Sequence, residues 1–295
     1  MRIAPILVLL FLSACASGAD QACRLQKLAE VPVRIVDNVP VLAVQINGRP
    51  ASLVLDTGSD HTVLNRIAAR RLGVPETAAA REIRGAGGAV SVGSGRMDVM
   101  GIGDLNLARV PVLLADNPRP PLDGLLGIDV LVDFEVELDV PRRRAAFYRA
   151  RSCPAARPDW TGRIVSLPVQ QQAGTGHFFV SMEVDGQPLR GMLDSGASRS
   201  TLSLQSAEDT GLGRRTLAAL PRTRSQTVNP EGLVIREAVF RQLKVGTDIL
   251  ERPRLTIADL PPFAGDLLVG ADYIGTRRLW FSFRIGRVFV STEPP

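Results

Sequence analysis

The sequence is poor in histidine and in aromatic residues. The only two histidines, His61 and His177, lie far apart and lack the spacing of a histidine-rich metal site, so we expect no bound metal and interpret both as surface or structural residues. Aromatic residues make up 5% of the chain, whereas 27 glycines and 21 prolines are spread along it, which favours many short strands and turns. An apolar content of 45% with 22% charged residues indicates a packed globular protein.

Lysine is nearly absent, since Lys27 and Lys244 are the only two, and the net charge of +5 therefore comes from arginine. Apart from Arg142-Arg143-Arg144 the arginines are scattered, and no aromatic residues are interleaved with them. A nucleic-acid surface needs a concentrated basic patch. We therefore expect no nucleic-acid partner and interpret the excess arginine as solvated surface.

Long hydrophobic runs are missing except at the N-terminus. Arg2 precedes an apolar run over residues 3–12, which is too short to span a bilayer as a mature helix and is followed by small residues. This pattern is typical of a secretory signal, which we place at residues 1–14. Leu12-Ser13-Ala14-Cys15 resembles a bacterial lipobox, which implies an exported protein held on the periplasmic side of a bacterial membrane by a lipid on Cys15. The alternative is an ordinary cleaved signal with an incidental Cys15.

Cysteine is also scarce, because removing Cys15 leaves only Cys23 and Cys153. Two cysteines in an exported chain can form a disulfide. Such a bond would fasten the start of the mature chain to its middle. Two free thiols are the alternative.

The chain contains an internal repeat with an offset of 138 positions and no gap. An apolar segment with a hairpin turn at Asn47-Gly48 ends in Asp56-Thr57-Gly58-Ser59. A second segment with a turn at Asp185-Gly186 ends in Asp194-Ser195-Gly196-Ala197. A repeat of this length predicts two lobes of the same local architecture. We expect a tether at 15–30, an N-terminal lobe at 31–150, a linker at 151–163 and a C-terminal lobe at 164–295.

Both halves continue with the same order of expected elements. A short helix ending at a glycine comes first, at residues 64–72 with Gly73 and at 202–212 with Gly213. A hairpin with a glycine-bearing tip follows, at 83–90 and 227–234, and is either a surface hairpin or a mobile flap over a cleft. An apolar pair before Gly127 or Gly270 comes next, and a pair of strands closes each half, at 136–139 with 145–148 and at 279–283 with 288–290.

These motifs resemble the pepsin and retropepsin class of aspartic peptidases. In that class an Asp-Thr-Gly or Asp-Ser-Gly tripeptide follows an apolar strand, and an apolar pair with glycine follows about seventy residues later, as Gly127 and Gly270 do here. The resemblance covers residues 31–292, and the lobes are similar in size to compact bacterial retropepsin-like domains. It implies an all-β, bilobal acid-protease fold with short helices. Because both lobes lie in one chain, we expect a monomer.

The resemblance implies an aspartic endopeptidase without a cofactor. Asp56 and Asp194 would meet across a pseudo-twofold axis and share one proton, because two adjacent carboxylates resist joint ionisation. One would act as general base on a water while the other donates a proton to the scissile carbonyl of a peptide or protein substrate. We expect the hydroxyls of Thr57 and Ser195 to bond across to the opposite loop.

Further residues are expected to support the dyad or the substrate. Gly58 and Gly196 would allow close backbone approach to the carboxylates. Ser59 is positioned in sequence to donate a hydrogen bond to Asp56, and Ala197 has no hydroxyl, so we hypothesise that the shared proton lies mostly on Asp194.

The remaining expected roles concern the substrate and the floor of the site, where the apolar pairs at 125–126 and 268–269 would pack behind the two loops. Asp60 and the glycines of the first hairpin tip, Gly85, Gly87 and Gly88, are expected to contact substrate. Neither tip carries the tyrosine of pepsin-type flaps, which leaves the flaps' contribution open. Asp129 and Asp272 are expected to cap the helices that follow Gly127 and Gly270.

Two alternatives to an enzyme remain on the same fold. The first is a catalytically silent protein that binds peptides or acts as a scaffold in the cell envelope. The second is a lipoprotein platform whose partners contact its basic surface. Both aspartates and both following hydroxyls are present, which argues against decay of the site without proving turnover.

Overall fold

A computed structural model describes residues 24–85, 88–116, 122–151, 156–170, 176–225 and 232–291. The expected signal at 1–14, the three cysteines Cys15, Cys23 and Cys153, and Gly87 lie outside these residues. Lipidation, disulfide pairing and a role for Gly87 therefore stay predictions. Among the described residues, no helix is long and apolar enough to cross a membrane.

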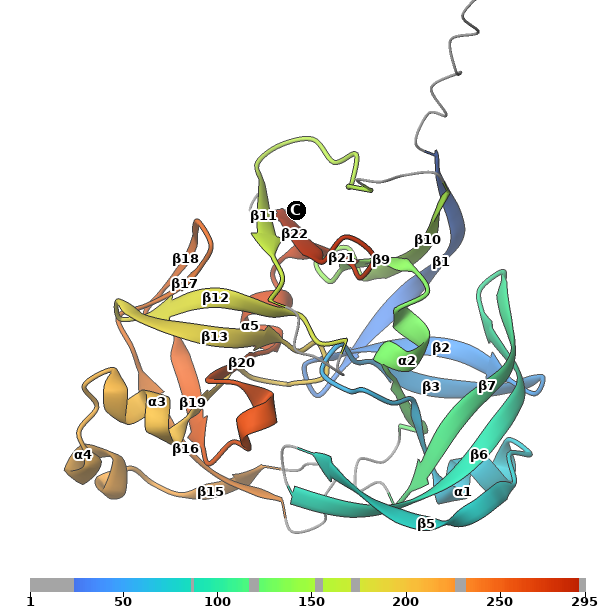
Figure 1. Cartoon of the computed structure of the whole chain (residues 1–295), viewed down its shortest axis with the longest axis horizontal. Helices are drawn as coiled ribbons and strands as arrows, with labels where there is room; N and C mark the ends of the chain where they lie inside the picture. The colour runs from blue at the N-terminus through green and yellow to red at the C-terminus, as the bar shows by residue number, and fades with distance from the viewer. Residues whose placement is uncertain are drawn as a thin grey trace, which may run out of the picture.

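The described chain is built mainly of strands, which confirms the expected all-β fold with short helices (Figure 1). The first half contains β1 (Arg24–Val36), β2 (Val39–Ile46), β3 (Arg49–Leu55), β4 (Val63–Asn65), α1 (Arg66–Arg71), β5 (Glu76–Gly85), β6 (Gly88–Ile102), β7 (Leu105–Ala115), β8 (Gly124–Leu126), α2 (Ile128–Leu131), β9 (Glu135–Asp139) and β10 (Arg144–Arg151). Residues 24–30, assigned to the tether, are thus the start of β1, which pairs with β10.

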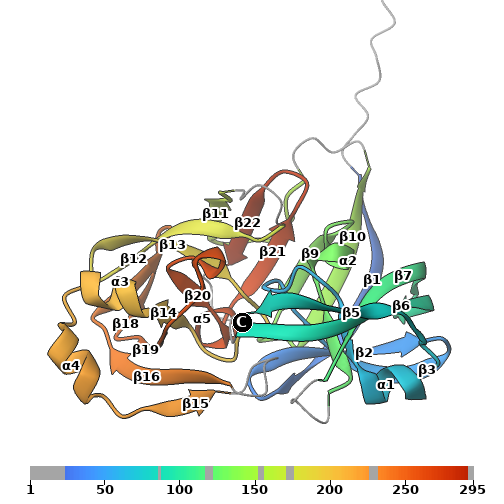
Figure 2. The ribbon, with the colours of Figure 1, turned by 60° about the horizontal axis from the view of Figure 1, so that its bottom comes forward.

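The second half repeats this order after β11 (Ile164–Pro168), as the two lobes in Figure 2 show. It contains β12 (Phe179–Val184), β13 (Gln187–Leu193), β14 (Thr201–Ser203), α3 (Leu204–Asp209), α4 (Arg214–Ala219), β15 (Thr223–Ser225), β16 (Leu233–Val239), β17 (Gln242–Val245), β18 (Asp248–Glu251), β19 (Arg254–Ala258), a 3-10 turn (Pro262–Ala264), β20 (Leu267–Val269), α5 (Ala271–Ile274), β21 (Arg278–Ser282) and β22 (Arg287–Ser291).

Each lobe places its aspartate at the end of a strand that lies beside a parallel neighbour. β3 and β13 follow tight hairpin turns, and at the first turn Asn47 and Gly48 adopt the positive φ values of 50° and 75° that the sequence predicts. β3 runs parallel to β8, and β13 runs parallel to β20. The apolar pairs before Gly127 and Gly270 therefore lie directly beside the strands that carry the aspartates.

The helix after each aspartate forms as expected, but one predicted boundary is wrong. Asn65 and Ser203, which correspond in the repeat, each accept a hydrogen bond at the helix N-terminus from the backbone three residues later. Gly73 follows α1 with φ of 70°. Gly213 does not end α3: Gly211 has the positive φ there, and Gly213 begins α4, a helix that the sequence analysis missed.

The lobes share one sheet. β9 of the first lobe pairs with β21 of the second over five residues, so the two closing strand pairs expected from the sequence join, with β1 and β11, into one continuous sheet. Figure 1 shows this shared sheet at the top of the molecule, away from β5 and β15. The lobes are therefore connected by backbone hydrogen bonds as well as by the linker.

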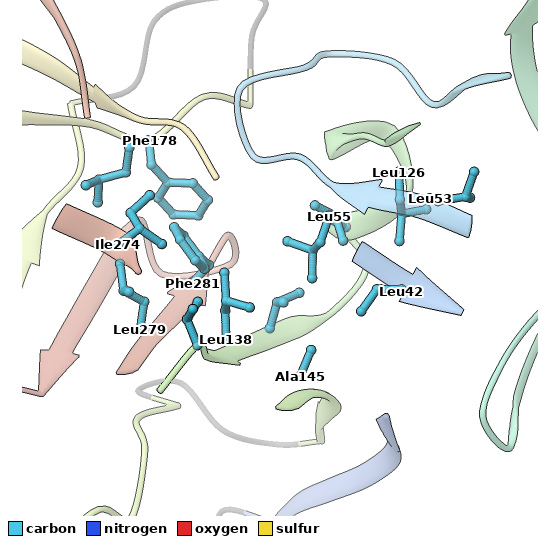
Figure 3. Packing of buried hydrophobic residues seen from close by; sticks show 14 of the residues in the cluster. Leu42, Leu53, Leu55, Leu126, Leu138, Ala145, Phe178, Ile274, Leu279 and Phe281 are labelled. Atoms are coloured by element: carbon cyan, nitrogen blue, oxygen red, sulfur yellow. The ribbon is translucent and has the colours of Figure 1, made fainter. Parts of the chain in front are cut away.

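One hydrophobic core runs through both lobes. It contains Leu55 and Leu126 of the first lobe, Phe178 of the second, and Phe281 of the shared sheet. The rings of Phe178 and Phe281 pack edge to face with centroids 5.3 Å apart. Figure 3 shows these four side chains among other buried apolar residues of both lobes. Movement of one loop is therefore resisted by packing in both lobes.

Glu137 is a buried charged residue of β9, at the centre of the shared sheet. Its carboxylate is 1% exposed and bonds to Arg144 of the first lobe at 2.9 Å, to Arg278 of the second at 2.8 Å, and to the hydroxyl of Tyr148 at 3.0 Å. Burial and the nearby Glu137 carboxylate raise the pKa of Tyr148. Glu137 therefore links the lobes by charge.

We expect Glu137→Gln to lower the free energy of unfolding by about 3 kcal/mol, because Arg144 and Arg278 lose the buried carboxylate that they share. Chemical denaturation measures the loss. Glu251→Gln, at an exposed position, is the matched control and should change stability by less than about 0.5 kcal/mol. Equal stability of the two variants would contradict a charge link between the lobes.

Candidate active site

The two aspartates lie at the same place in the two lobes. The backbone N–H of Asp56 donates to the carbonyl of Leu126 at 3.0 Å, and that of Asp194 donates to the carbonyl of Val269 at 3.0 Å. The parallel strand in each lobe thus fixes the start of each loop. This is the floor that the sequence predicted behind the loops.

The two loops are tied together by reciprocal hydrogen bonds. The hydroxyl of Thr57 donates to the carbonyl of Leu193 at 2.8 Å and accepts from the N–H of Ser195 at 3.0 Å. The hydroxyl of Ser195 donates to the carbonyl of Leu55 at 2.6 Å and accepts from the N–H of Thr57 at 3.0 Å. Both hydroxyl side chains are buried. The sequence-based expectation for Thr57 and Ser195 therefore agrees with this geometry.

Gly58 and Gly196 lie against the carboxylate of the opposite lobe. A Cβ atom at Gly58 would lie 2.3 Å from Cγ of Asp194, and one at Gly196 would lie 2.3 Å from Cγ of Asp56. No side chain fits at such distances. Each glycine N–H also donates to the carboxylate of its own loop at 2.9 Å. The glycines are thus required by the approach of the loops rather than by a turn alone.

The carboxyl groups of Asp56 and Asp194 interact directly through a side-chain hydrogen bond. Burial, followed by the charge of Asp56, raises the pKa of Asp194 well above that of an ordinary carboxyl group. The N–H groups of Gly196 and Ala197 oppose this effect, since they donate to the Asp194 carboxylate at 2.9 and 3.1 Å. The direction of the shift agrees with a shared proton that lies mostly on Asp194.

The reason expected for that asymmetry is wrong. The hydroxyl of Ser59 donates to the carbonyl of His61 at 2.8 Å, so its single proton is not available to Asp56. Ser59 stabilises the bend of its own loop instead. The difference between Ser59 and Ala197 therefore does not place the proton through a hydrogen bond to the dyad.

Asp129 and Asp272 do not cap their helices as expected. The N-caps of α2 and α5 are Gly127 and Gly270, without a side-chain hydrogen bond. Asp129 instead accepts from the N–H of Thr62 at 2.9 Å and from its hydroxyl at 2.7 Å. In the second lobe Asp272 binds Ser200 in the same way, at 2.8 and 2.6 Å.

Thr62 and Ser200 are supporting residues that the sequence analysis missed. The hydroxyl of each also accepts from the N–H of the glycine after the apolar pair, Gly127 at 3.1 Å and Gly270 at 3.0 Å. They thereby hold the far end of each catalytic loop. The signal was present, since a hydroxyl residue stands at both positions in the register of the repeat.

A cleft of about 710 Å³ lies over the dyad and is lined by both lobes. Described residues of both hairpins contribute to it, Ile83 and Gly85 from the first and Ser225 and Leu233 from the second. Asp60 lines the cleft as well, whereas Gly88 pairs with Gly85 in the hairpin but is not among the lining residues. Both hairpins are therefore placed as walls of the same cleft.

His61 and His177 also line the cleft, a location that the sequence did not predict. The imidazole of His177 is 4% exposed, and its Nε2 lies 3.3 Å from Oδ1 of Asp60 in the other lobe. No group of three or more histidine, cysteine, aspartate or glutamate side chains in the described part of the chain has the arrangement of a metal site.

Two crossed loops with paired aspartates, under a cleft between two similar lobes, define a protein of the acid-protease type. The comparisons agree: the family described as aspartyl protease matches residues 42–130 and 180–273, together more than half of the chain. The chain therefore belongs to the aspartyl protease family. No curated protein matches it significantly.

A crystal structure of an aspartic proteinase from Irpex lacteus has the same fold. The superposition has a TM-score of 0.57 and covers 90% of this chain and 97% of that chain, at 13% sequence identity. This likeness confirms the two-lobed architecture.

We expect Gly58→Ala to abolish any activity of the dyad, because the added methyl group would overlap the Asp194 carboxyl group at 2.3 Å. Peptide hydrolysis and thermal unfolding together measure the effect. Gly213→Ala is the matched control, since no heavy atom lies within 4 Å of a Cβ there and its φ is negative. An active Gly58→Ala protein would contradict the close approach of the two loops.

We expect Asp194→Asn to stabilise the protein at alkaline pH. A carboxyl group with a raised pKa holds its proton more tightly in the folded state, so its contribution to stability is complete below about pH 4 and is lost as the pH rises towards the raised value. Asparagine does not titrate. The melting temperature of the Asp194→Asn variant should therefore exceed that of the wild type at pH 8, and the difference should be smaller at pH 3. The opposite trend would refute the raised pKa.

Proposed function

We propose that the protein is an aspartic endopeptidase that hydrolyses peptide bonds in extended substrates. The observation that carries this proposal is the reciprocal bonding of Thr57 and Ser195, which holds Asp56 and Asp194 within a direct hydrogen bond of each other. A scaffold has no need of two adjacent carboxyl groups, because their repulsion costs stability.

In this mechanism the raised pKa of Asp194 keeps its carboxyl group protonated while Asp56 is charged. Asp56 removes a proton from a water held between the carboxyl groups, and the oxygen of that water attacks the scissile carbonyl. Asp194 donates its proton to the carbonyl oxygen. When the tetrahedral intermediate collapses, Asp56 gives its proton to the departing amine nitrogen and the C–N bond breaks. One hydroxyl of the intermediate returns its proton to Asp194, so the dyad again holds a single proton.

The substrate would lie in the 710 Å³ cleft between the two hairpins. Asp60 and Gly85 line that cleft and are placed to contact the bound chain. Apolar side chains contribute to the wall from both lobes, among them Ile83 and Leu233. Both lobes of the chain contribute to the site, so the proposed active form is a monomer.

We further propose that the protein acts in the cell envelope of a bacterium. The support is the order of a charged start, a short apolar run and a lipobox-like sequence ending at Cys15. The mature protein would be tethered by a lipid on Cys15 to the periplasmic side of a membrane. Mass determination of the purified full-length product tests this directly.

Hydrolysis of a peptide library by the wild type, Asp56→Asn and Asp194→Asn tests the proposed activity. Each substitution should lower kcat/KM by at least about a thousandfold, because each removes one proton-transfer partner. Asp104→Asn, in an exposed turn, is the matched control and should retain wild-type activity. Wild-type activity should decline as the pH rises through the raised pKa of Asp194. Binding without hydrolysis at every pH would favour a silent peptide-binding protein.

A further inference from the structure

The two lobes are nearly equal at the dyad but differ at the flanks of the cleft. Asp60 corresponds in the repeat to Ser198, and His177 corresponds to Val39. Asp60 and His177 face each other across the lobes, with 3.3 Å between Oδ1 and Nε2. Ser198 lines the cleft, whereas Val39 is fully buried in an apolar cluster. One flank of the cleft is therefore more polar than the other.

His177 is held firmly at this position by the backbone on both sides of it. The carbonyl of Phe178 accepts from the N–H of Leu193, the residue before Asp194, at 3.1 Å. On the other side, a Cβ at Gly176 would lie 2.4 Å from Cγ2 of Ile128 in the first lobe. The His177 ring packs edge to face on Phe179 with centroids 6.1 Å apart. The imidazole thus has a fixed place between the lobes.

The imidazole is buried without satisfying its polar atoms. Neither Nδ1 nor Nε2 of His177 has a hydrogen-bond partner among the described residues, although the side chain is only 4% exposed. Leaving a buried polar group unpaired costs about 1–3 kcal/mol. The Asp60 carboxylate beside it is 46% exposed towards the cleft. An occupant of the cleft that bonds to both groups would remove this cost.

We propose that His177 and Asp60 form a subsite for a substrate side chain that carries hydrogen-bond donors, such as an amide or an ammonium group. The Asp60 carboxylate accepts hydrogen bonds only, and a neutral imidazole whose Nε2–H faces Asp60 keeps Nδ1 as an acceptor. A carboxylate side chain is repelled by Asp60, and an aliphatic one leaves both groups unpaired. The opposite flank, with Ser198 and Val39, lacks this chemistry, so the pair fixes the direction of the bound peptide.

This inference rests on the proposed function for the cleft, and a binding measurement separates the two. The inactive Asp194→Asn protein is titrated with fluorescein-labelled octapeptides that carry Gln, Lys, Leu or Glu at each position in turn. At one position, peptides with Gln or Lys should bind about tenfold more tightly than peptides with Leu, the equivalent of one hydrogen bond to a charged group. Peptides with Glu should bind most weakly there.

Two substitutions introduce the residues found on the opposite flank of the cleft. Each should remove the preference for peptides with Gln or Lys. His177→Val and Asp60→Ser, each in the Asp194→Asn background, should reduce the tenfold difference to less than about threefold. Circular dichroism spectra that match the spectrum of the Asp194→Asn protein verify that both variants fold. His177→Gln keeps a donor and an acceptor and should restore part of the preference. Asp104→Asn, in an exposed turn outside the cleft lining, should retain the preference.

Each result either supports or overturns the subsite. Absence of a preference at every position, or a preference that survives His177→Val, overturns it. Hydrolysis by the wild type without any donor preference leaves the endopeptidase intact and removes only the subsite. The expected preference without hydrolysis by the wild type retains the subsite and removes the endopeptidase. Failure of every peptide to bind overturns both.

Discussion

The architecture depends on a closed ring of four hydrogen bonds between two loops. Thr57 and Ser195 each donate to a carbonyl of the opposite lobe and accept from the other's backbone N–H. Every polar atom in the ring is satisfied only when both loops are present, so neither lobe alone completes its own loop. The parallel strands, the close glycines and the bonds from Asp129 and Asp272 serve to hold the two loops at this separation.

That ring forces together two groups that would separate in water. Because the two carboxyl groups are held close together, they form a hydrogen bond and the pKa of Asp194 is raised. The compensation lies elsewhere in the molecule, in a core that runs through both lobes and in the pairing of β9 with β21. The paired carboxyl groups thus destabilise the folded protein, and the shared core and shared sheet stabilise it.

The sequence predicted the parts of the fold that repeat locally. Hairpin turns, strand ends and the two tripeptides have short-range signals, and the offset of 138 positions related the lobes to each other. The shared sheet had no such signal, because the pairing of β9 with β21 joins residues more than a hundred positions apart. The contact of His177 with Asp60 was missed for the same reason, since Asp60 belongs to the other lobe.

Errors within the site came from assigning a side chain to the wrong hydrogen-bond partner. Ser59 was within reach of Asp56 in sequence, but the bend of the loop directs its hydroxyl to the His61 carbonyl. Asp129 lies in the first turn of a helix, yet its side chain binds Thr62, which lies 67 positions earlier in the chain. The first error concerns a local bend and the second a tertiary contact that the sequence does not show.

The shared sheet also sets how the molecule can move. It lies at the top of the view in Figure 1, and the hairpins β5–β6 and β15–β16 lie at the bottom. The pairing of β9 with β21 joins the lobes at this side. A rotation of one lobe about this pairing would displace the distant hairpins by a larger arc than groups close to the pairing. The width of the cleft at the hairpins is therefore the dimension that the shared sheet constrains least.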